Sequence, residues 1–227
     1  MMIGGLQKST LIDYPGKISA IVFTAGCNLN CGYCHNPELR QYSPRSSEEE
    51  VLSFLRKRAN QLDAVTITGG EPTVQPDLPA FAAKLKGLGF LVKLDTQGTN
   101  PQMVRDMVHR GLVDYIAMDL KAPLERYAEV TNSFVDQDAI RESISLIMAE
   151  APDYEFRTTI VAEQLGVGDI EEIGKLIQGA KRHYAQGFVA SKSLNDPAFL
   201  SRRAPGPEEM EEMRRIMSAY VREAFIR

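Results

Sequence analysis

The sequence predicts an α/β protein, a partial (β/α)6 TIM-like barrel in a single domain that covers residues 1–227. Three observations lead to this fold class. Runs rich in β-branched residues alternate six times with amphipathic segments of helical period. Parallel strands need a crossover helix between them. A complete eight-unit barrel takes about 250 residues, whereas this chain has 227.

The composition agrees with a folded domain and excludes several classes of protein. Hydrophobic residues make up 44% of the chain and charged residues 25%, which is ordinary globular usage. The net charge of −4 lacks the basic excess of a nucleic-acid binder. The longest apolar run, residues 18–25, is far shorter than the roughly 20 residues that span a bilayer. Because the first residues do not form a signal peptide, we expect a cytoplasmic protein with no nucleic-acid or membrane partner.

The elements of the six units can be placed in order along the chain. Strands are expected at 18–23, 64–68, 90–94, 115–118, 156–161 and 188–190. Helices are expected from near 47, at 78–88 and 101–111, from about 138, at 169–183, and as a C-terminal helix at about 207–226. Ser47 and Glu50 fit a capping box at the start of the first helix. His109 and His183 fall on predicted helices and are interpreted as surface or hydrogen-bonded residues.

Polar residues follow the strands, where the loops of such barrels build the active site. Cysteines follow the first strand, a Gly-Gly-Glu sequence follows the second, and acidic and basic residues follow the third and fourth. In chain order these residues are Cys27, Cys31, Cys34, Gly69, Gly70, Glu71, Asp95, Thr96, Asp119 and Lys121.

The three cysteines are the only ones in the chain and lie within one loop, residues 24–36. An odd, clustered set is a poor disulfide framework, whereas the C-x3-C-x2-C spacing suits a compact soft-metal centre. A four-iron four-sulfur cluster would leave one iron without a protein ligand. A structural zinc would need His35 as fourth ligand, although it adjoins Cys34. A metal-free group of thiols is the third alternative.

The segment GCNLNCGYCHNPE, residues 26–38, resembles the radical S-adenosylmethionine signature. Within that superfamily the chain is similar to the glycyl-radical-enzyme activases, and most closely to the anaerobic ribonucleoside-triphosphate reductase activating proteins. The segments STLIDYPG, TGGEP, DTQG and MDLK extend the resemblance in the family's order.

The resemblance implies roles for individual residues. Cys27, Cys31 and Cys34 would hold a 4Fe-4S cluster whose open iron chelates S-adenosylmethionine. Glu71 would accept hydrogen bonds from the cofactor's amino group, and Lys121 would meet its carboxylate. The remaining implied cofactor contacts are Tyr33, Gly69, Gly70, Asp95, Thr96 and Arg157. Asp95 and Asp119 would also bind a monovalent cation, sodium or potassium.

The resemblance also implies the reaction. A reduced cluster would cleave S-adenosylmethionine into methionine and a 5'-deoxyadenosyl radical, which takes a hydrogen from a glycine Cα of a partner glycyl-radical enzyme. That partner would be anaerobic ribonucleotide reductase, and Asp13 and Tyr14 would meet its glycine loop. The chain holds no second cysteine cluster, so flavodoxin or ferredoxin would donate the electron, in an anaerobic setting.

Two alternatives stay open. The first is a small-molecule radical enzyme such as 7-carboxy-7-deazaguanine synthase, against which the DYPG and CHNPE segments speak. The second is a non-catalytic interaction module in which the cysteines bind zinc. One departure from the related sequences is that residues 189–193 offer none of the Gln, His or Arg contacts expected after the sixth strand.

Overall fold

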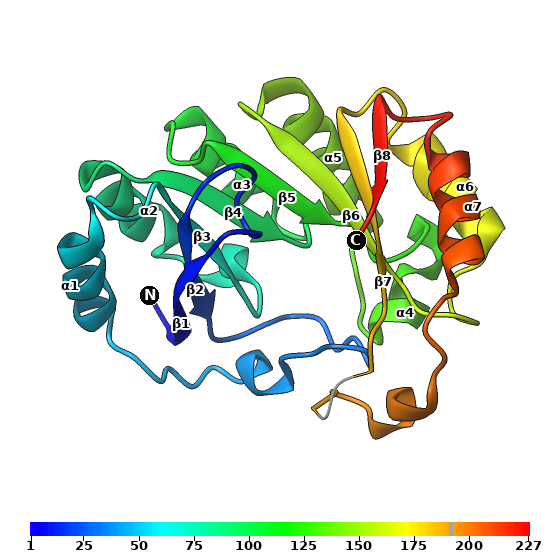
Figure 1. The fold of residues 1–227 in the computed structure, drawn as a ribbon, viewed down its shortest axis with the longest axis horizontal. Coiled ribbons are helices and arrows are strands. Elements are labelled where there is room, and N and C mark those ends of the chain that lie inside the picture. Colours follow the sequence, from blue (N-terminus) through cyan, green and yellow to red (C-terminus); the bar gives the residue numbers. More distant parts are fainter. Residues whose placement is uncertain (191–192) are drawn as a thin grey trace.

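One curved eight-stranded sheet runs through the computed structural model, which describes residues 1–190 and 193–227. Its strands are neighbours in chain order (Figure 1). They are β1 Ile3–Thr10, β2 Ser19–Thr24, β3 Ala64–Gly69, β4 Leu91–Thr96, β5 Tyr115–Asp119, β6 Tyr154–Ile160, β7 Arg182–Gly187 and β8 Glu223–Ile226. β1 is antiparallel to β2, and every later pair is parallel.

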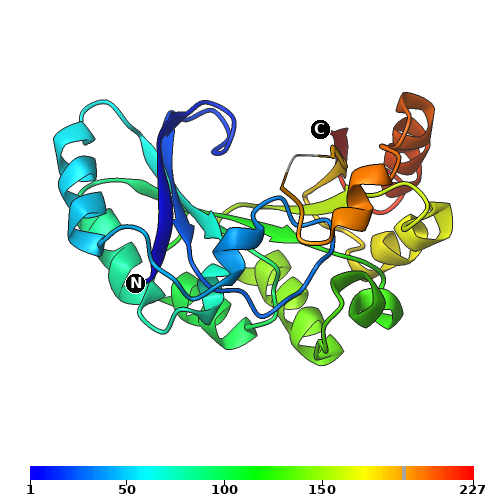
Figure 2. The ribbon, with the colours of Figure 1, turned by 90° about the horizontal axis from the view of Figure 1, so that it is seen from below.

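Helices cover one face of this sheet, and Figure 2 shows them along its convex side. The α-helices are α1 Glu48–Arg58, α2 Leu78–Gly87, α3 Pro101–His109, α4 Tyr127–Thr131, α5 Gln137–Glu150, α6 Val167–Leu176 and α7 Pro207–Met217. Short 3-10 helices are η1 Pro37–Arg40, η2 Pro72–Val74, η3 Leu124–Arg126 and η4 Pro197–Ser201. The capping box predicted at Ser47 and Glu50 is present at the start of α1.

The partial barrel of six β/α units is confirmed. Each strand from β2 to β7 is followed by a helix that crosses to the next parallel strand. Among the described residues no pairing joins β8 to β1, so the sheet curls without closing. The sequence did not indicate β1 or β8, because β1 contains two glycines and polar residues and β8 is only four residues long.

The sixth unit begins earlier than the sequence predicted. The helix expected at 169–183 ends at Leu176, and the strand expected at 188–190 is β7, Arg182–Gly187. His183 is therefore a buried strand residue rather than a helix-surface residue, with its Nε2 3.0 Å from Thr158 Oγ1. Burial lowers the pKa of His183 to about 3, so its ring is neutral at physiological pH. His109, in contrast, is exposed on α3 as expected and lies 2.6 Å from Glu150.

The C-terminal helix is also shorter than predicted. It ends at Met217 rather than near residue 226, and β8 follows it. The buried residues of this helix are Met210, Met213 and Met217. Tyr220 instead lies in the connection, where its carbonyl accepts a hydrogen bond from the Gly179 amide at 2.8 Å. This long-range contact turns the chain back to the sheet.

The two faces of the sheet differ in polarity. Alternate residues such as Val65, Ile67 and Leu94 face the helices and form the core. Side chains on the concave face include Lys93 and Glu155, which are almost fully buried. The fold thus places charged groups inside the half-barrel. No helix in the part of the chain that the structure describes is long and apolar enough to cross a membrane.

Candidate active site

The cysteine loop follows β2 and is held by hydrogen bonds to residues outside the loop. The Gly26 amide donates to Leu39 O at 2.7 Å, and the Asn30 amide donates to Thr131 O at 3.1 Å. Arg40 Nε donates to Leu29 O at 3.1 Å. Because the loop contains no helix or strand of its own, these contacts determine where its three thiols lie.

The three thiols line one cavity of about 240 Å³ at the carboxyl ends of the strands. Burial raises the pKa of the Cys27 thiol to about 11 and also raises the pKa of Cys31. A soft metal centre would displace those protons and bind the thiolates. The cavity is also lined by Tyr33, Gly69, Gly70, Glu71, Asp95, Thr96, Gln97, Asp119 and Lys121. The structure therefore brings together nearly all of the site residues that the sequence indicated.

Gly69 and Gly70 pack the end of β3 against the start of the cysteine loop. Gly69 has φ +122°, and a Cβ there would lie 2.2 Å from the Thr24 amide nitrogen. A Cβ on Gly70 would lie 2.1 Å from Gly26 O. The Gly70 and Glu71 amides donate to Thr24 O and Gly26 O at 2.9 and 2.8 Å. The glycines thus permit a close approach between two parts of the chain's own backbone.

Glu71 lies buried at one side of the cavity. Its Oε1 accepts hydrogen bonds from Thr73 Oγ1 at 2.5 Å and from Thr96 Oγ1 at 2.7 Å. Its Oε2 accepts one from the Gln97 amide at 2.9 Å. Burial raises the pKa of Glu71, although these donors oppose the shift. All of its partners are neutral, so the carboxylate lacks a cationic partner among the described residues.

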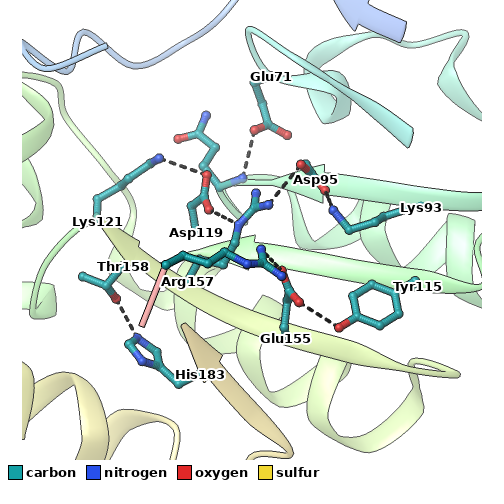
Figure 3. Close-up of polar contacts among 12 residues, drawn as sticks. Glu71, Lys93, Asp95, Tyr115, Asp119, Lys121, Glu155, Arg157, Thr158 and His183 are labelled. Carbon is teal, nitrogen blue, oxygen red and sulfur yellow. Dashed lines mark hydrogen bonds and ion pairs between the residues drawn. The ribbon is translucent and has the colours of Figure 1, made fainter. Parts of the chain in front are cut away.

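A ladder of charged side chains crosses the concave face beside the cavity (Figure 3). Arg157 joins two strand-end carboxylates, with Nη1 3.1 Å from Asp95 Oδ2 and Nε 2.7 Å from Asp119 Oδ1. Lys93 also pairs with Asp95, and Lys121 Nζ lies 3.2 Å from Asp119 Oδ2. Burial disfavours the ionised carboxyl, but Arg157 and Lys121 outweigh it and hold the pKa of Asp119 well below its usual range.

The charges of the ladder suit a carboxylate ligand better than a cation. Three cationic side chains face the two carboxylates of Asp95 and Asp119, so the ladder has one positive charge in excess. The negative Glu71, with neutral partners only, lies near Cys27, and Lys121 lies near Cys31. An α-amino acid group has one charge of each sign and could bind across this cavity. The ladder offers no unbalanced negative charge for sodium or potassium.

The structure does not favour a single metal ion at the cysteine loop. In the described ranges, 1–190 and 193–227, no three cysteine, histidine or acidic side chains are arranged to hold one ion. His35 Nε2 lies 2.7 Å from Val189 O, and its ring packs on Phe188. The fourth ligand that a zinc site would need is therefore engaged elsewhere. Three cysteine thiols around one cavity fit a larger iron-sulfur cluster instead.

Asp13 and Tyr14 lie at the other end of the sheet. They follow β1, whose Thr10 pairs with Ser19 at the start of β2. Asp13 Oδ2 accepts a 2.5 Å hydrogen bond from Thr10 Oγ1, and Tyr14 packs on Tyr115 with 5.8 Å between ring centroids. The structure thus does not bring these two residues to the cavity.

Two site residues were missed by sequence reasoning. Gln97 lines the cavity and is only 4% exposed, and its Oε1 has no hydrogen-bond partner among the residues that the structure describes. Its position in the DTQG segment could have indicated it. Asn195 contacts the cysteine loop from the segment after β7, and no local signal marks it. Sequence reasoning found no cofactor contact in residues 189–193. Residues 191–192 of this segment lie outside the described residues.

Comparisons with known proteins identify the family of the chain. Residues 21–177 match the family model of the radical SAM superfamily. The chain is 32% identical to a Methanocaldococcus jannaschii protein with the provisional name glycyl-radical enzyme activating enzyme, over 100% of this chain and 95% of that protein. It is 31% identical to the pyruvate formate-lyase-activating enzyme of Clostridium pasteurianum over 52% of each.

Two further comparisons extend the range of similar proteins. The chain is 28% identical to the 7-carboxy-7-deazaguanine synthase of Thermococcus kodakarensis over 72% of each. The structure of Streptococcus suis SuiB bound to S-adenosylmethionine aligns with a TM-score of 0.65 and 15% identity, over 89% of this chain and 48% of that one. At this identity the likeness concerns the fold alone.

Proposed function

The chain belongs to the radical SAM superfamily, and on this premise we propose that it is a glycyl-radical-enzyme activase. Membership implies a 4Fe-4S cluster and S-adenosylmethionine as cofactors. One observation carries the proposal: three cysteine thiols, one buried and two half-buried, share a cavity with Glu71 and Lys121. The likeness to a provisionally named activating enzyme over the whole chain supports the reaction class.

The residues present would hold the cofactors in distinct places. Cys27, Cys31 and Cys34 would ligate three irons of the cluster. Glu71 would accept hydrogen bonds from the amino group of S-adenosylmethionine, and Lys121 would pair with its carboxylate. When bound, the cluster supplies one electron that cleaves S-adenosylmethionine to methionine and a carbon radical able to take a glycine Cα hydrogen.

Four further contacts are proposed around the same cavity. Tyr33, Gly69, Gly70 and Thr96 all line it, so they would contact the bound cofactor. Arg157 and Asp95, which already pair with one another, would set the charge around its carboxylate. A sodium or potassium ion at Asp95 and Asp119 would need the cofactor carboxylate to balance the ladder's excess positive charge.

The proposed partner is a glycyl-radical enzyme, specifically anaerobic ribonucleotide reductase, with flavodoxin or ferredoxin as electron donor. Asp13 and Tyr14 lie at the amino ends of the parallel strands. A partner segment that contacts both these residues and the cavity would therefore have to extend along the half-barrel from one end to the other.

Anaerobic reconstitution tests the proposal. The wild-type protein should bind about four irons per chain and cleave S-adenosylmethionine under reduction. Changing each cysteine to alanine should abolish cleavage. Co-incubation with the candidate reductase should give a glycyl-radical doublet in electron paramagnetic resonance. Colourless, zinc-loaded protein without cleavage would refute the proposal. If cleavage supports turnover of a small-molecule substrate and activates no glycyl-radical enzyme, the synthase-like alternative is favoured.

A further inference from the structure

Asn195 forms hydrogen bonds with the cysteine loop. One of its partners there is Asn30, which lies 165 residues away in the chain. It lies between β7 and η4, and Figure 2 shows this orange segment beside the blue loop that follows β2. The proposed reaction assigns no role to Asn195. Its contacts nevertheless reach the backbone of two of the three cysteines.

The Asn195 side chain and backbone donate to successive parts of the loop. Nδ2 donates to Asn30 Oδ1 at 2.9 Å and to Cys31 O at 3.1 Å. The Asn195 amide donates to Cys34 O at 3.2 Å, and the Asp196 amide donates to Gly32 O at 3.0 Å. The carbonyls of residues 31, 32 and 34 are thus all satisfied by two consecutive residues.

Arg40 determines which way the Asn195 amide faces. Arg40 Nη1 donates to Asn195 Oδ1 at 2.6 Å, and Arg40 Nε donates to Leu29 O. Because Oδ1 faces the guanidinium, Nδ2 is directed at the loop carbonyls. Phe199 completes the contact, since its ring is 6.2 Å from the Tyr33 ring and would be 2.4 Å from a Cβ on Gly32.

We propose that Asn195 is a positioning residue for the iron-sulfur cluster, through the hydrogen bonds that its side-chain Nδ2 donates to Asn30 Oδ1 and Cys31 O. The amide that donates to Cys34 O belongs to the main chain and remains in every side-chain variant. An irregular loop without these donors has many backbone conformations, and ordering it on cluster binding costs conformational entropy. The Asn195 side chain holds the Cys31 backbone in the arrangement that the cluster needs. Hydrogen bonding around a cluster also tunes its electronic properties. The inference rests on the proposed function only in that the loop carries the cluster.

The test uses Asn195→Ala and Asn195→Asp in the full chain, with Asn60→Ala as control. Asn60 is an exposed asparagine after α1. Asn195→Asp keeps the size of the side chain and a partner for Arg40, but turns an oxygen toward the loop carbonyls in place of the Nδ2 donor. After anaerobic reconstitution, we expect both variants to lose the cluster to a chelator at least tenfold faster than wild type, with an altered paramagnetic resonance spectrum of the reduced cluster. Asn60→Ala should match wild type in both.

The outcomes separate the two proposals. If wild type holds the cluster and both Asn195 variants match Asn60→Ala in loss rate and spectrum, the positioning role is wrong and the proposed function stands. If wild type binds no cluster, both proposals fail. Thermal unfolding of the iron-free proteins detects a variant that does not fold. Should Asn195→Ala fail to fold, Asn195→Asp alone decides.

Discussion

The two ends of the parallel sheet differ in how their buried charged groups are paired. At the amino end, Tyr115 donates to Glu155 Oε2 at 2.9 Å, and Arg227 Nη1 lies 3.3 Å from Glu155 Oε1. Arg227 also lies over the Tyr184 ring, 4.0 Å from its centroid. At the carboxyl end, the cysteine thiols line a cavity, and Gln97 Oε1 has no partner in the described part of the chain.

This difference indicates which end of the sheet binds a ligand. Buried polar groups are normally hydrogen-bonded, and each exception needs an explanation. The amino end pairs its buried Glu155 carboxylate within the chain, although Ser19 Oγ and His183 Nδ1 at that end have no partner among the described residues. The carboxyl end retains an unpartnered amide oxygen, the cysteine thiols and a ladder with excess positive charge, all beside one cavity. In barrels of this type that end is where the active site lies.

The largest expected effect comes from removing Arg157, which serves both stability and the cavity. Arg157→Met leaves Asp95 and Asp119 without their shared guanidinium, and breaking a buried ion pair costs about 3–5 kcal/mol. We expect that loss in the free energy of unfolding at neutral pH, measured by denaturant titration. S-adenosylmethionine cleavage should fall with it.

The pH dependence of this loss follows from Asp119. Its folded-state pKa lies below the usual range, so its stabilising contribution is present above the unfolded pKa of about 3.9 and disappears as pH falls toward the folded value. The difference between wild type and Arg157→Met should therefore shrink as pH falls below about 4. A difference that grows on acidification would contradict this account of the ladder.

A smaller effect is expected from Gly70→Ala. The new Cβ would lie 2.1 Å from Gly26 O and 2.8 Å from Leu39 O, so the cysteine loop must shift, at about 1–3 kcal/mol. Cluster content and the free energy of unfolding should both fall. The matched control is Gly87→Ala in α2, where a Cβ meets no atom within 4 Å and helix propensity predicts a gain of about 0.5–1 kcal/mol.

Tyr115→Phe tests the amino end. It removes one hydrogen bond to the buried Glu155 carboxylate, which should cost about 1–3 kcal/mol of the free energy of unfolding. S-adenosylmethionine cleavage by the folded variant should stay within twofold of wild type. A much larger loss of cleavage would show that the two ends are coupled. It would contradict the assignment of stability to the amino end and of ligand binding to the carboxyl end.

The smallest effect is expected from Asp13→Ala. The variant loses the hydrogen bond with Thr10, worth about 1 kcal/mol, and cleavage without partner should not change. Activation of the partner enzyme is the informative measurement. A selective loss of glycyl radical would support the contact proposed for Asp13, whereas equal loss of activation and cleavage would refute it.

Sequence reasoning was most successful where short-range spacing carries the information. The capping box at Ser47 and the six β/α units were found because periodicity and capping act over a few residues. Placing Glu71, Asp95 and Asp119 at one cavity also followed, since parallel strands end at the same edge. β8 and the true end of α7 were missed, because a contact with Gly179 decides where that helix turns back.

The sequence by itself determined the family, the open-iron cysteine spacing and the order of the units, all of which are local patterns along the chain. Only the tertiary structure decided that Arg157 bridges two aspartates, that Glu71 has neutral partners, and that Asn195 fastens the cysteine loop. Apart from the contact of Glu71 with Thr73, each of these contacts joins residues far apart in the chain. The physical reason is that such contacts depend on strand register and curvature, which set distances between segments that no single stretch of sequence encodes.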